Sequence, residues 1–328
     1  MTVRNSFSFK LNEVQQKLLV GLLKSGTYRP ARVEHTIAAA VTPDCRINLY
    51  KSGKCLIQGK GAGDFVTFVM EPLVLKTAML GYEDIHNPEA SQPHMGIDES
   101  GKGDFFGPMV VSAAYVDPEL ADKMREMDVK DSKNITSDAK AMTMGRDIRK
   151  LLGGKFAIVK IGPEAYNRLY AKMRSVNTLL AWAHARAIEN LLENVPDCPR
   201  AVSDQFGKKE QVEKALMKKG RRIELVQRHK AETDIAVAAA SIIARDAFLR
   251  SLSAMKKEYG IEFPKGASEK VKETAVKLSG EEGAQILLKT AKCHFRTTDS
   301  ILETIGSERK NLGPEGMAVS RPRQTRWN

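Results

Sequence analysis

Residues 96–108 constrain the fold of this chain more than any other stretch, and they read Gly-Ile-Asp-Glu-Ser-Gly-Lys-Gly-Asp-Phe-Phe-Gly-Pro. Two adjacent carboxylates, Asp98 and Glu99, lead into a Gly-Lys-Gly turn, and the apolar run over residues 109–116 predicts a buried strand. Because neighbouring side chains on a strand point to opposite faces, the two carboxylates can converge only where a strand ends or bends, which the glycines allow. Acids at a strand end beside glycine-rich backbone are typical of a site for a divalent cation and a phosphate, although an ordinary acidic turn has the same residues.

The charge of the chain indicates the kind of partner it binds. Its 328 residues carry a formal net charge of +12, with a sequence pI of about 9.4. A basic excess of this size favours a polyanionic partner, nucleic acid above all, although it can also serve solubility alone. With 42% hydrophobic and 28% charged residues, the composition is typical of a soluble globular chain and not of a disordered one.

Cysteine spacing and hydropathy indicate the compartment. The cysteines are far apart and lack the spacing of a zinc site, so we expect reduced thiols at Cys45, Cys55, Cys198 and Cys293. No apolar stretch approaches the roughly 20 residues that span a bilayer. The N-terminal apolar run, residues 18–23, is too short for an export signal. We therefore expect a cytoplasmic protein with no membrane partner.

The N-terminal quarter of the chain predicts a separate small domain. Residues 1–85 indicate an α+β unit with the order strand, helix, three strands and helix. The expected elements are residues 6–11, 12–25, 35–41, 46–50, 54–58 and 65–80. This order resembles one unit of a TATA-binding-protein-like fold. The polar residues 86–95, which include two prolines, predict a linker.

Residues 96–310 alternate strands with helices and predict an α/β domain, whereas the basic residues 311–328 predict a disordered tail. Besides residues 109–116, the expected strands are 156–161, 201–203 and 222–227, and the expected long helices are 137–152, 175–194 and 235–257. Carboxylates stand at the ends of these elements, namely Asp98, Glu99, Asp204 and Glu232. Each of them alone is more typical of a helix cap or a solvated turn, and either Glu232 or Asp234 could cap the helix that follows.

The positions of these acids together favour a metal site. Acids that end different strands of one sheet can meet at a single edge of it, as in open α/β sheets. Such like charges repel one another unless cations lie between them. Two Mg²⁺ or Mn²⁺ ions, about 3.5–4 Å apart, would activate a water and stabilise the leaving oxygen of a phosphodiester.

Several motifs of the chain together resemble the type 2 ribonucleases H. They are residues 96–108, Asp131-Ser132-Lys133, Ser203-Asp204-Gln205-Phe206, and Lys230-Ala231-Glu232 followed by residues 238–245. Within that family the chain is similar to ribonuclease HIII. The features that favour this branch are the Gly-Lys-Gly turn, a Glu as the fourth acid, residues 177–182 and the TATA-binding-protein-like N-terminal domain.

The resemblance implies a ribonuclease H-like mixed sheet flanked by helices, with Mg²⁺ or Mn²⁺ as cofactor. It implies four catalytic and metal-binding acids, Asp98, Glu99, Asp204 and Glu232, with Asp234 as the alternative to the last. It further implies that Gly101, Lys102 and Gly103 contact the ribose 2′-OH, and that Lys102 and Lys133 contact phosphates. The implied reaction is endonucleolytic hydrolysis of the RNA strand of RNA–DNA hybrids, leaving 5′-phosphate and 3′-hydroxyl ends. We expect a monomer whose N-terminal domain adds affinity for the hybrid.

Two other functions fit parts of the pattern. The first is the activity typical of ribonuclease HII, which is incision at a single ribonucleotide embedded in DNA. The second is a nucleic-acid-binding module whose acids only cap helices. A dinucleotide-binding oxidoreductase is excluded, because no complete glycine fingerprint is present. His294 is more typical of a structural residue, and we place it outside the catalytic set.

Overall fold

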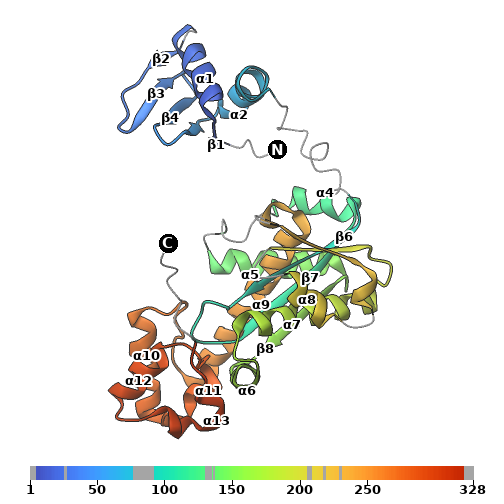
Figure 1. The fold of residues 1–328 in the computed structure, drawn as a ribbon, viewed down its shortest axis with the longest axis vertical. Coiled ribbons are helices and arrows are strands. Elements are labelled where there is room, and N and C mark those ends of the chain that lie inside the picture. Colours follow the sequence, from blue (N-terminus) through green and yellow to red (C-terminus); the bar gives the residue numbers. More distant parts are fainter. Residues whose placement is uncertain are drawn as a thin grey trace. The chain divides into compact units, whose positions relative to one another are not determined.

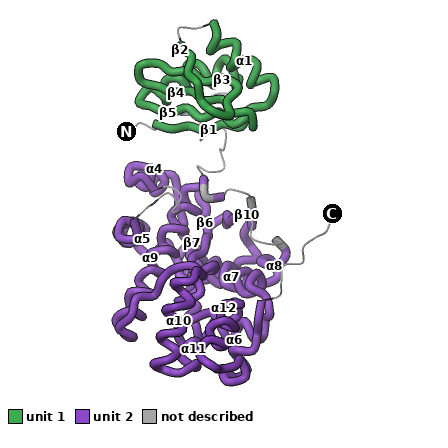
Figure 2. Tube along the Cα trace, turned by 90° about the vertical axis from the view of Figure 1, so that its left-hand side faces the viewer, with its two compact units in different colours: residues 1–89 green, residues 90–328 purple. Residues whose placement is uncertain are grey.

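Figure 1 shows the computed structural model of the chain. The structure describes residues 5–25, 28–76, 92–129, 135, 137–204, 209–216, 219–228 and 231–320. The chain forms two compact units, residues 1–89 and 90–328, coloured separately in Figure 2. The division falls inside the stretch that the sequence predicts to be a linker.

Unit 1 is an antiparallel sheet with helices packed on one face. The strand order is β1-β5-β4-β3-β2, and the strands are β1 (Ser6–Lys10), β2 (Arg29–Pro30), β3 (Thr36–Val41), β4 (Arg46–Tyr50) and β5 (Lys54–Gln58). Alternate residues of the strands, such as Phe7, Ile47 and Ile57, are buried. They pack with Leu19 and Leu23 of helix α1 (Glu13–Ser25) in a core of the unit's own.

The predicted helix over residues 65–80 takes a different form. A short α-helix, α2 (Ala62–Phe65), continues as a π-helical stretch, η1 (Val66–Leu75), which ends at Lys76 in the left-handed conformation with φ 53°. Pro72 lies inside η1 and has no N–H to donate to a regular α-helical bond. The remainder of the prediction, residues 77–80, lies outside the described residues.

Unit 2 is built on a mixed sheet with the order β10-β9-β6-β7-β8. The strands are β6 (His94–Ser100), β7 (Met109–Val116), β8 (Phe156–Ile161), β9 (Arg200–Asp204) and β10 (Glu224–Arg228). β7 is antiparallel to both of its neighbours, β6 and β8, whereas β9 runs parallel to β6, and β10 runs parallel to β9. The predicted linker ends earlier than expected, because His94 and Met95 are buried and begin β6.

Helices cover both faces of this sheet (Figure 1). One face packs against α9 (Ile235–Tyr259), α5 (Asp138–Leu152) and α4 (Pro118–Glu126), and the other packs against α7 (Val176–Asn194) and α6 (Pro163–Met173). A Cβ on Gly96 would lie 2.1 Å from the backbone of Ala236 and of Val237, so α9 lies directly on the middle of β6. Short elements complete this part of the chain: α8 (Lys209–Ala215), η4 (Gly220–Arg222) and η5 (Ala231–Thr233).

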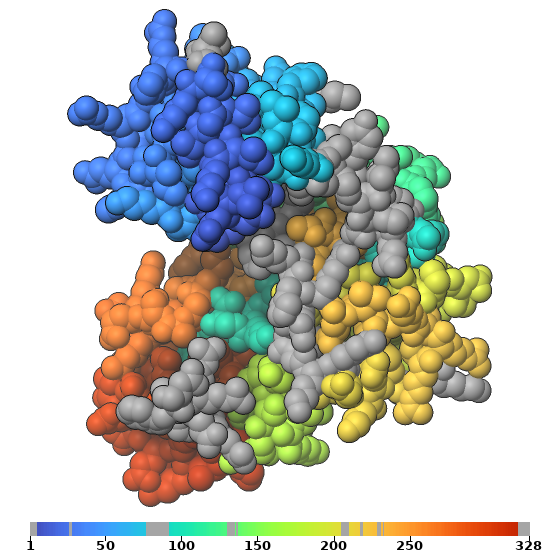
Figure 3. All heavy atoms as spheres, turned by 45° about the horizontal axis from the view of Figure 1, so that its top comes forward, coloured from blue at the N-terminus to red at the C-terminus, as the bar shows by residue number. Residues whose placement is uncertain are grey.

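The C-terminal residues form a helical segment, which Figure 3 shows in orange to red. It consists of α10 (Glu269–Glu282), α11 (Ile286–Thr290), α12 (Thr297–Thr304), η6 (Arg309–Leu312) and α13 (Gly313–Gly316). The sequence predicts disorder over residues 311–328, but residues 311–320 are ordered in the structure. Leu312 and Ala318 are buried, and the N–H of Ser320 donates to the carbonyl of His294. These apolar residues order the segment, while residues 321–328 lie outside the described part of the chain.

Within the described ranges, no helix combines the length and apolar character needed to cross a membrane.

Candidate active site

Asp98 and Asp204 lie side by side at the ends of two neighbouring parallel strands. β6 and β9 pair through Met95–Ala201, Gly96–Val202 and Ile97–Ser203. Asp98 and Asp204 are the next residues in this register. Parallel strands are about 4.8 Å apart and matched residues share a face, so both side chains extend from the face that α9 covers.

Glu99 extends from the opposite face of β6, which α7 covers. Its Oε2 lies 3.3 Å from His184 Nε2 on α7, and its Oε1 lies 3.3 Å from Lys102 Nζ. Asp98 accepts hydrogen bonds from Ser241 of α9 and from the N–H of Glu99. The two acids therefore stay on alternate faces of β6, which ends one residue after Glu99, at Ser100.

The electrostatics of this pair indicate a site that favours a cation. Burial, and to a lesser extent the charge of Glu99, raise the pKa of Asp98 to about 6, even though the hydrogen bonds from Ser241 and the Glu99 N–H act to lower it. Burial also acts to raise the pKa of Glu99, but His184 and Lys102 outweigh it and hold that pKa below its ordinary value. A divalent ion would relieve the repulsion between these buried oxygens, and oxygen donors suit Mg²⁺ and Mn²⁺. The residues present therefore fit the expected metal.

The sequence did not single out His184. It lies on the mostly apolar buried face of α7, where a histidine is more typical of the core, and only the packing of α7 on β6 brings it to Glu99.

Asp234, the alternative fourth ligand, is 3% exposed and caps α9. Its Oδ1 accepts from the N–H groups of Ala236 at 3.0 Å and Val237 at 3.2 Å, and lies 2.9 Å from His94 Nε2. His94 is the first residue of β6, so Asp234 sits beside the end of the strand opposite to Ser100. The capping role that the sequence offered for this residue is confirmed.

The backbone of Glu232 lies in η5, beside β9. Its neighbour Ala231 packs with Val202 and Val237 in a small apolar cluster. The side chain of Glu232 lies outside what the structure describes, as do Asp131, Ser132 and Lys133. Among the described side chains, no set of three or more His, Cys, Asp or Glu residues forms a complete metal cluster.

The glycine-rich loop after Glu99 has a shape that its glycines require. Gly101 and Gly107 have φ of 84° and 76°, and a Cβ on Gly101 would lie 2.2 Å from the carbonyl oxygen of Pro108. A Cβ on Gly103 would meet nothing within 4 Å, so the middle of the loop is open to an approaching group. Lys102 is partly exposed beside it and pairs with Glu99.

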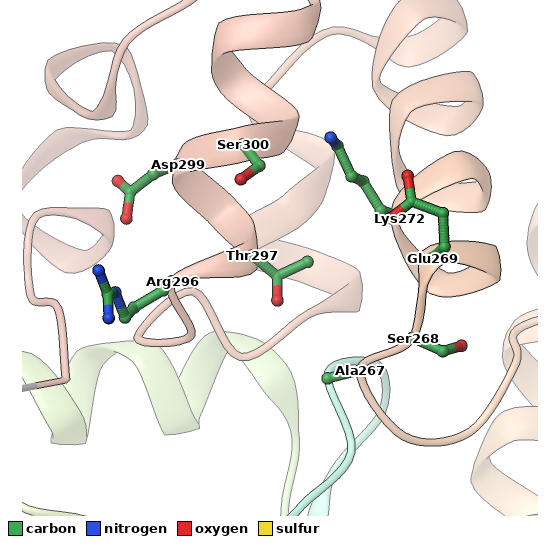
Figure 4. Close-up of a pocket in the computed structure, with 8 residues that line it drawn as sticks. All are labelled: Ala267, Ser268, Glu269, Lys272, Arg296, Thr297, Asp299 and Ser300. Carbon is green, nitrogen blue, oxygen red and sulfur yellow. The ribbon is translucent and has the colours of Figure 1, made fainter. Parts of the chain in front are cut away.

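A pocket also lies between α10 and α12, away from the acids (Figure 4). Its lining mixes basic and acidic side chains: Ala267, Ser268, Glu269, Lys272, Arg296, Thr297, Asp299 and Ser300. None of the predicted catalytic residues belongs to it.

His294 is buried among aromatic rings, with centroids 4.5 Å from those of Tyr170 and Phe295. Burial lowers the pKa of His294 to about 3, so this ring stays neutral. Its environment agrees with a structural role.

Comparison with known proteins defines the class. The family described as Ribonuclease HII matches residues 95–298, which include the sheet and its acids. Unit 2 is therefore a ribonuclease H-type domain with a mixed α/β fold.

The curated relatives define the branch. Ribonuclease HIII of Chlamydia pneumoniae is 39% identical over 297 residues, covering 90% of this chain and 97% of the relative. Ribonuclease HIII of Chlamydia trachomatis serovar L2 is 41% identical over 270 residues, covering 82% and 88%. The solved structure of Bst-RNase HIII in complex with Mn²⁺ aligns with a TM-score of 0.63 at 26% identity, covering 92% and 99%. The RNase H3 of Aquifex aeolicus aligns with a TM-score of 0.50 at 28% identity, covering 87% of this chain and 98% of that chain. The chain belongs to the ribonuclease HIII family and is a ribonuclease H.

Proposed function

We propose that this chain is an endonuclease that hydrolyses the RNA strand of RNA–DNA hybrids with Mg²⁺ or Mn²⁺, leaving 5′-phosphate and 3′-hydroxyl ends. The observation that carries the proposal is the placement of Asp98, Glu99 and Asp204 at the ends of two paired strands, with the pKa of Asp98 raised to about 6. The structure of a similar ribonuclease HIII with Mn²⁺ supports the choice of metal.

Each acid has a separate part in holding the ions. Asp98 and Asp204 would hold them from the α9 face of the sheet, and Glu99 from the α7 face, where His184 and Lys102 orient its carboxylate. Glu232 is the proposed fourth ligand. Bound Mg²⁺ or Mn²⁺ would activate a water and stabilise the leaving oxygen of the phosphodiester.

We propose that the glycine-rich loop recognises the ribose of the RNA strand. Backbone groups of Gly101, Lys102 and Gly103 would contact the 2′-OH, the group by which RNA differs from DNA. The open space at Gly103 supports this role. Lys102 and Lys133 would contact phosphates of the hybrid.

Unit 1 is proposed as a TATA-binding-protein-like domain that adds affinity for the hybrid. The sheet face away from α1 carries a row of paired residues formed by Ser8, Leu56, Asn48 and Ala39. The exposed cations Arg46 and Lys54 lie on strands of the same sheet. A flat sheet face bordered by cations suits contact with a polyanionic duplex.

The decisive experiment incubates an end-labelled RNA–DNA hybrid with the protein and Mg²⁺ or Mn²⁺. We expect endonucleolytic cleavage of the RNA strand, and we expect Asp98→Asn to lower the rate at least about 100-fold, the upper end of the cost of disturbing a partner of a metal ligand. Asp122→Asn, an exposed acid of α4, is the matched control and should cleave at the parent rate. An Asp98→Asn variant as fast as the parent contradicts the metal assignment.

A duplex with one embedded ribonucleotide separates the two ribonuclease activities. We expect weak incision of it relative to a continuous hybrid, whereas robust Mg²⁺-dependent incision would favour the ribonuclease HII type. Binding without cleavage, indifferent to divalent ions, would favour a binding module.

A further inference from the structure

The loop of residues 101–107 joins β6 to β7, and two distant segments hold it. On one side, the N–H of Phe105 donates to the carbonyl of Gly266 at 2.8 Å, and the N–H of Gly266 donates to Asp104 Oδ1 at 2.6 Å. The close-up in Figure 4 shows this loop, in pale teal, passing beside Ala267. The loop is therefore fixed to the start of the C-terminal helical segment.

On the other side, the chain after α11 lies against the same loop. The N–H of Gly107 donates to the carbonyl of Thr290 at 2.9 Å, and the N–H of Lys292 donates to the carbonyl of Phe105 at 2.8 Å. Phe106 and Ala291 form an antiparallel bridge between these bonds. Asn167 of α6 in turn holds the chain after α11. Its side-chain amide donates to the carbonyl of Ala291 and accepts from the N–H of Cys293.

The Lys292 side chain completes these contacts from within the core. It is fully buried, and its Nζ donates to the carbonyl of Gly107 at 2.7 Å and to that of Phe106 at 3.2 Å. The Tyr166 ring lies below it, with Nζ 5.9 Å from the ring centroid. These two bonds fix the direction of both carbonyl groups.

A lysine at this position is costly for stability. Burial lowers the pKa of Lys292 to about 7, although the charge of Asp104 acts in the other direction. A methionine of similar length would fill the same space without desolvating a charge, but it could not donate to the carbonyls of Phe106 and Gly107. The ammonium is therefore buried at a cost, and both of its acceptors belong to the loop that bears Gly101 and Gly103.

We propose that Lys292 is a positioning residue for catalysis, which fixes the Gly101–Gly107 loop relative to Asp98 and Glu99 by holding the carbonyls of Phe106 and Gly107. The inference rests on the proposed function, in which the backbone of this loop contacts the ribose 2′-OH. Loss of the lysine leaves the acids and unit 1 in place but lets the loop shift. Small displacements of a bound substrate from the reacting geometry cost about 100-fold in rate.

The test measures hybrid cleavage and metal activation of Lys292→Met alongside the parent enzyme. We expect kcat to fall about 10- to 100-fold, while KM for the hybrid and the Mn²⁺ concentration for half-maximal activity change less than about threefold. Amide hydrogen exchange should accelerate at Phe105 and Gly107, whose N–H groups bond across the loop.

Two further variants make the result unambiguous. Leu278→Ala removes a buried side chain from α10 without touching the loop, so it should lower Tm yet keep the parent kcat. Asp104→Ala releases the loop from Gly266 at a partly exposed position, so it should lower kcat in the same way even if Lys292→Met folds poorly.

The outcomes separate the two claims. A parent that does not cleave the hybrid rejects the proposed function. An active parent with kcat of Lys292→Met or Asp104→Ala within twofold of it overturns the positioning role, and so does an equal loss of kcat in Leu278→Ala.

Discussion

At the scale of single residues, the site works through side chains whose neighbours come from distant parts of the chain. The sequence predicted Asp98, Glu99 and Asp204 as site residues, because acids at strand ends beside glycines are visible locally. It could not identify His184 or Lys292, since the roles of both depend on contacts made across the fold, to Glu99 and to the loop. The role of Asp234 could not be assigned from the sequence, because a helix-capping acid and a metal-binding acid have the same local pattern. In the folded chain its side chain lies beside His94.

The buried charge of Asp98 predicts a stability that depends on pH. Its folded pKa of about 6 lies above the ordinary value of 3.8, so the folded state holds the proton more tightly than the unfolded state does. The stabilising contribution is therefore complete below about pH 3.8 and is lost as the pH rises through 6, leaving a cost of about 3 kcal/mol at neutral pH. Without metal, Asp98→Asn should raise Tm at pH 7.5, and the difference should shrink between pH 6 and 4.

Thermal unfolding in EDTA across this pH range tests the claim. Asp122→Asn, which changes an exposed acid, should leave Tm almost unchanged at every pH. Equal Tm values of Asp98→Asn and the parent at pH 7.5 would show that the carboxylate carries no such cost.

At the scale of elements, local patterns predicted most of the catalytic sheet and its long helices. Residues 109–116 and 156–161 form β7 and β8 with the predicted bounds, and the predicted helix over residues 137–152 forms α5, which Ser137 caps. The apolar runs and caps that specify these elements lie within them. The conversion of the second N-terminal helix to a π-helical stretch was not predicted, because it depends on Pro72 in its packed setting.

The contact between α9 and β6 predicts a severe effect for one methyl group. Gly96→Ala would place its Cβ 2.1 Å from the α9 backbone, and backbone cannot move aside as a flexible side chain can. We expect a loss of about 1–3 kcal/mol or more in the free energy of unfolding, as for overpacked cores. Urea denaturation measures it.

Gly280→Ala provides the matched control. This glycine lies inside α10, and a Cβ there meets nothing within 4 Å, so the variant should gain about 0.4–1 kcal/mol. If Gly96→Ala were as stable as the parent, α9 would not be held against β6 at this point.

At the scale of the whole molecule, each unit has its own core. The core of unit 1 contains residues between Phe7 and Val74 only, and those of unit 2 contain residues from Met95 onward. Separate cores allow each unit to fold alone. The division of labour proposed for them is therefore testable by cutting the chain between residues 89 and 90.

A chain of residues 90–328 should still cleave at saturating hybrid, since the predicted acids all lie within it. Its affinity should fall at least about tenfold, and the dependence of affinity on salt should weaken, because phosphate contacts of unit 1 are lost. Fluorescence anisotropy with a labelled hybrid at several salt concentrations measures both. Unchanged affinity would show that unit 1 serves another purpose.

The bond from Lys292 to Gly107 joins positions 185 residues apart. During synthesis, the acids and the glycine-rich loop leave the ribosome long before the segment that shapes the loop. A nascent polypeptide that already contains every predicted acid therefore still lacks the contacts from Lys292 that hold the loop. Premature termination near residue 285 would remove the same contacts, so we expect such a chain to lose cleavage rate at least as far as Lys292→Met does.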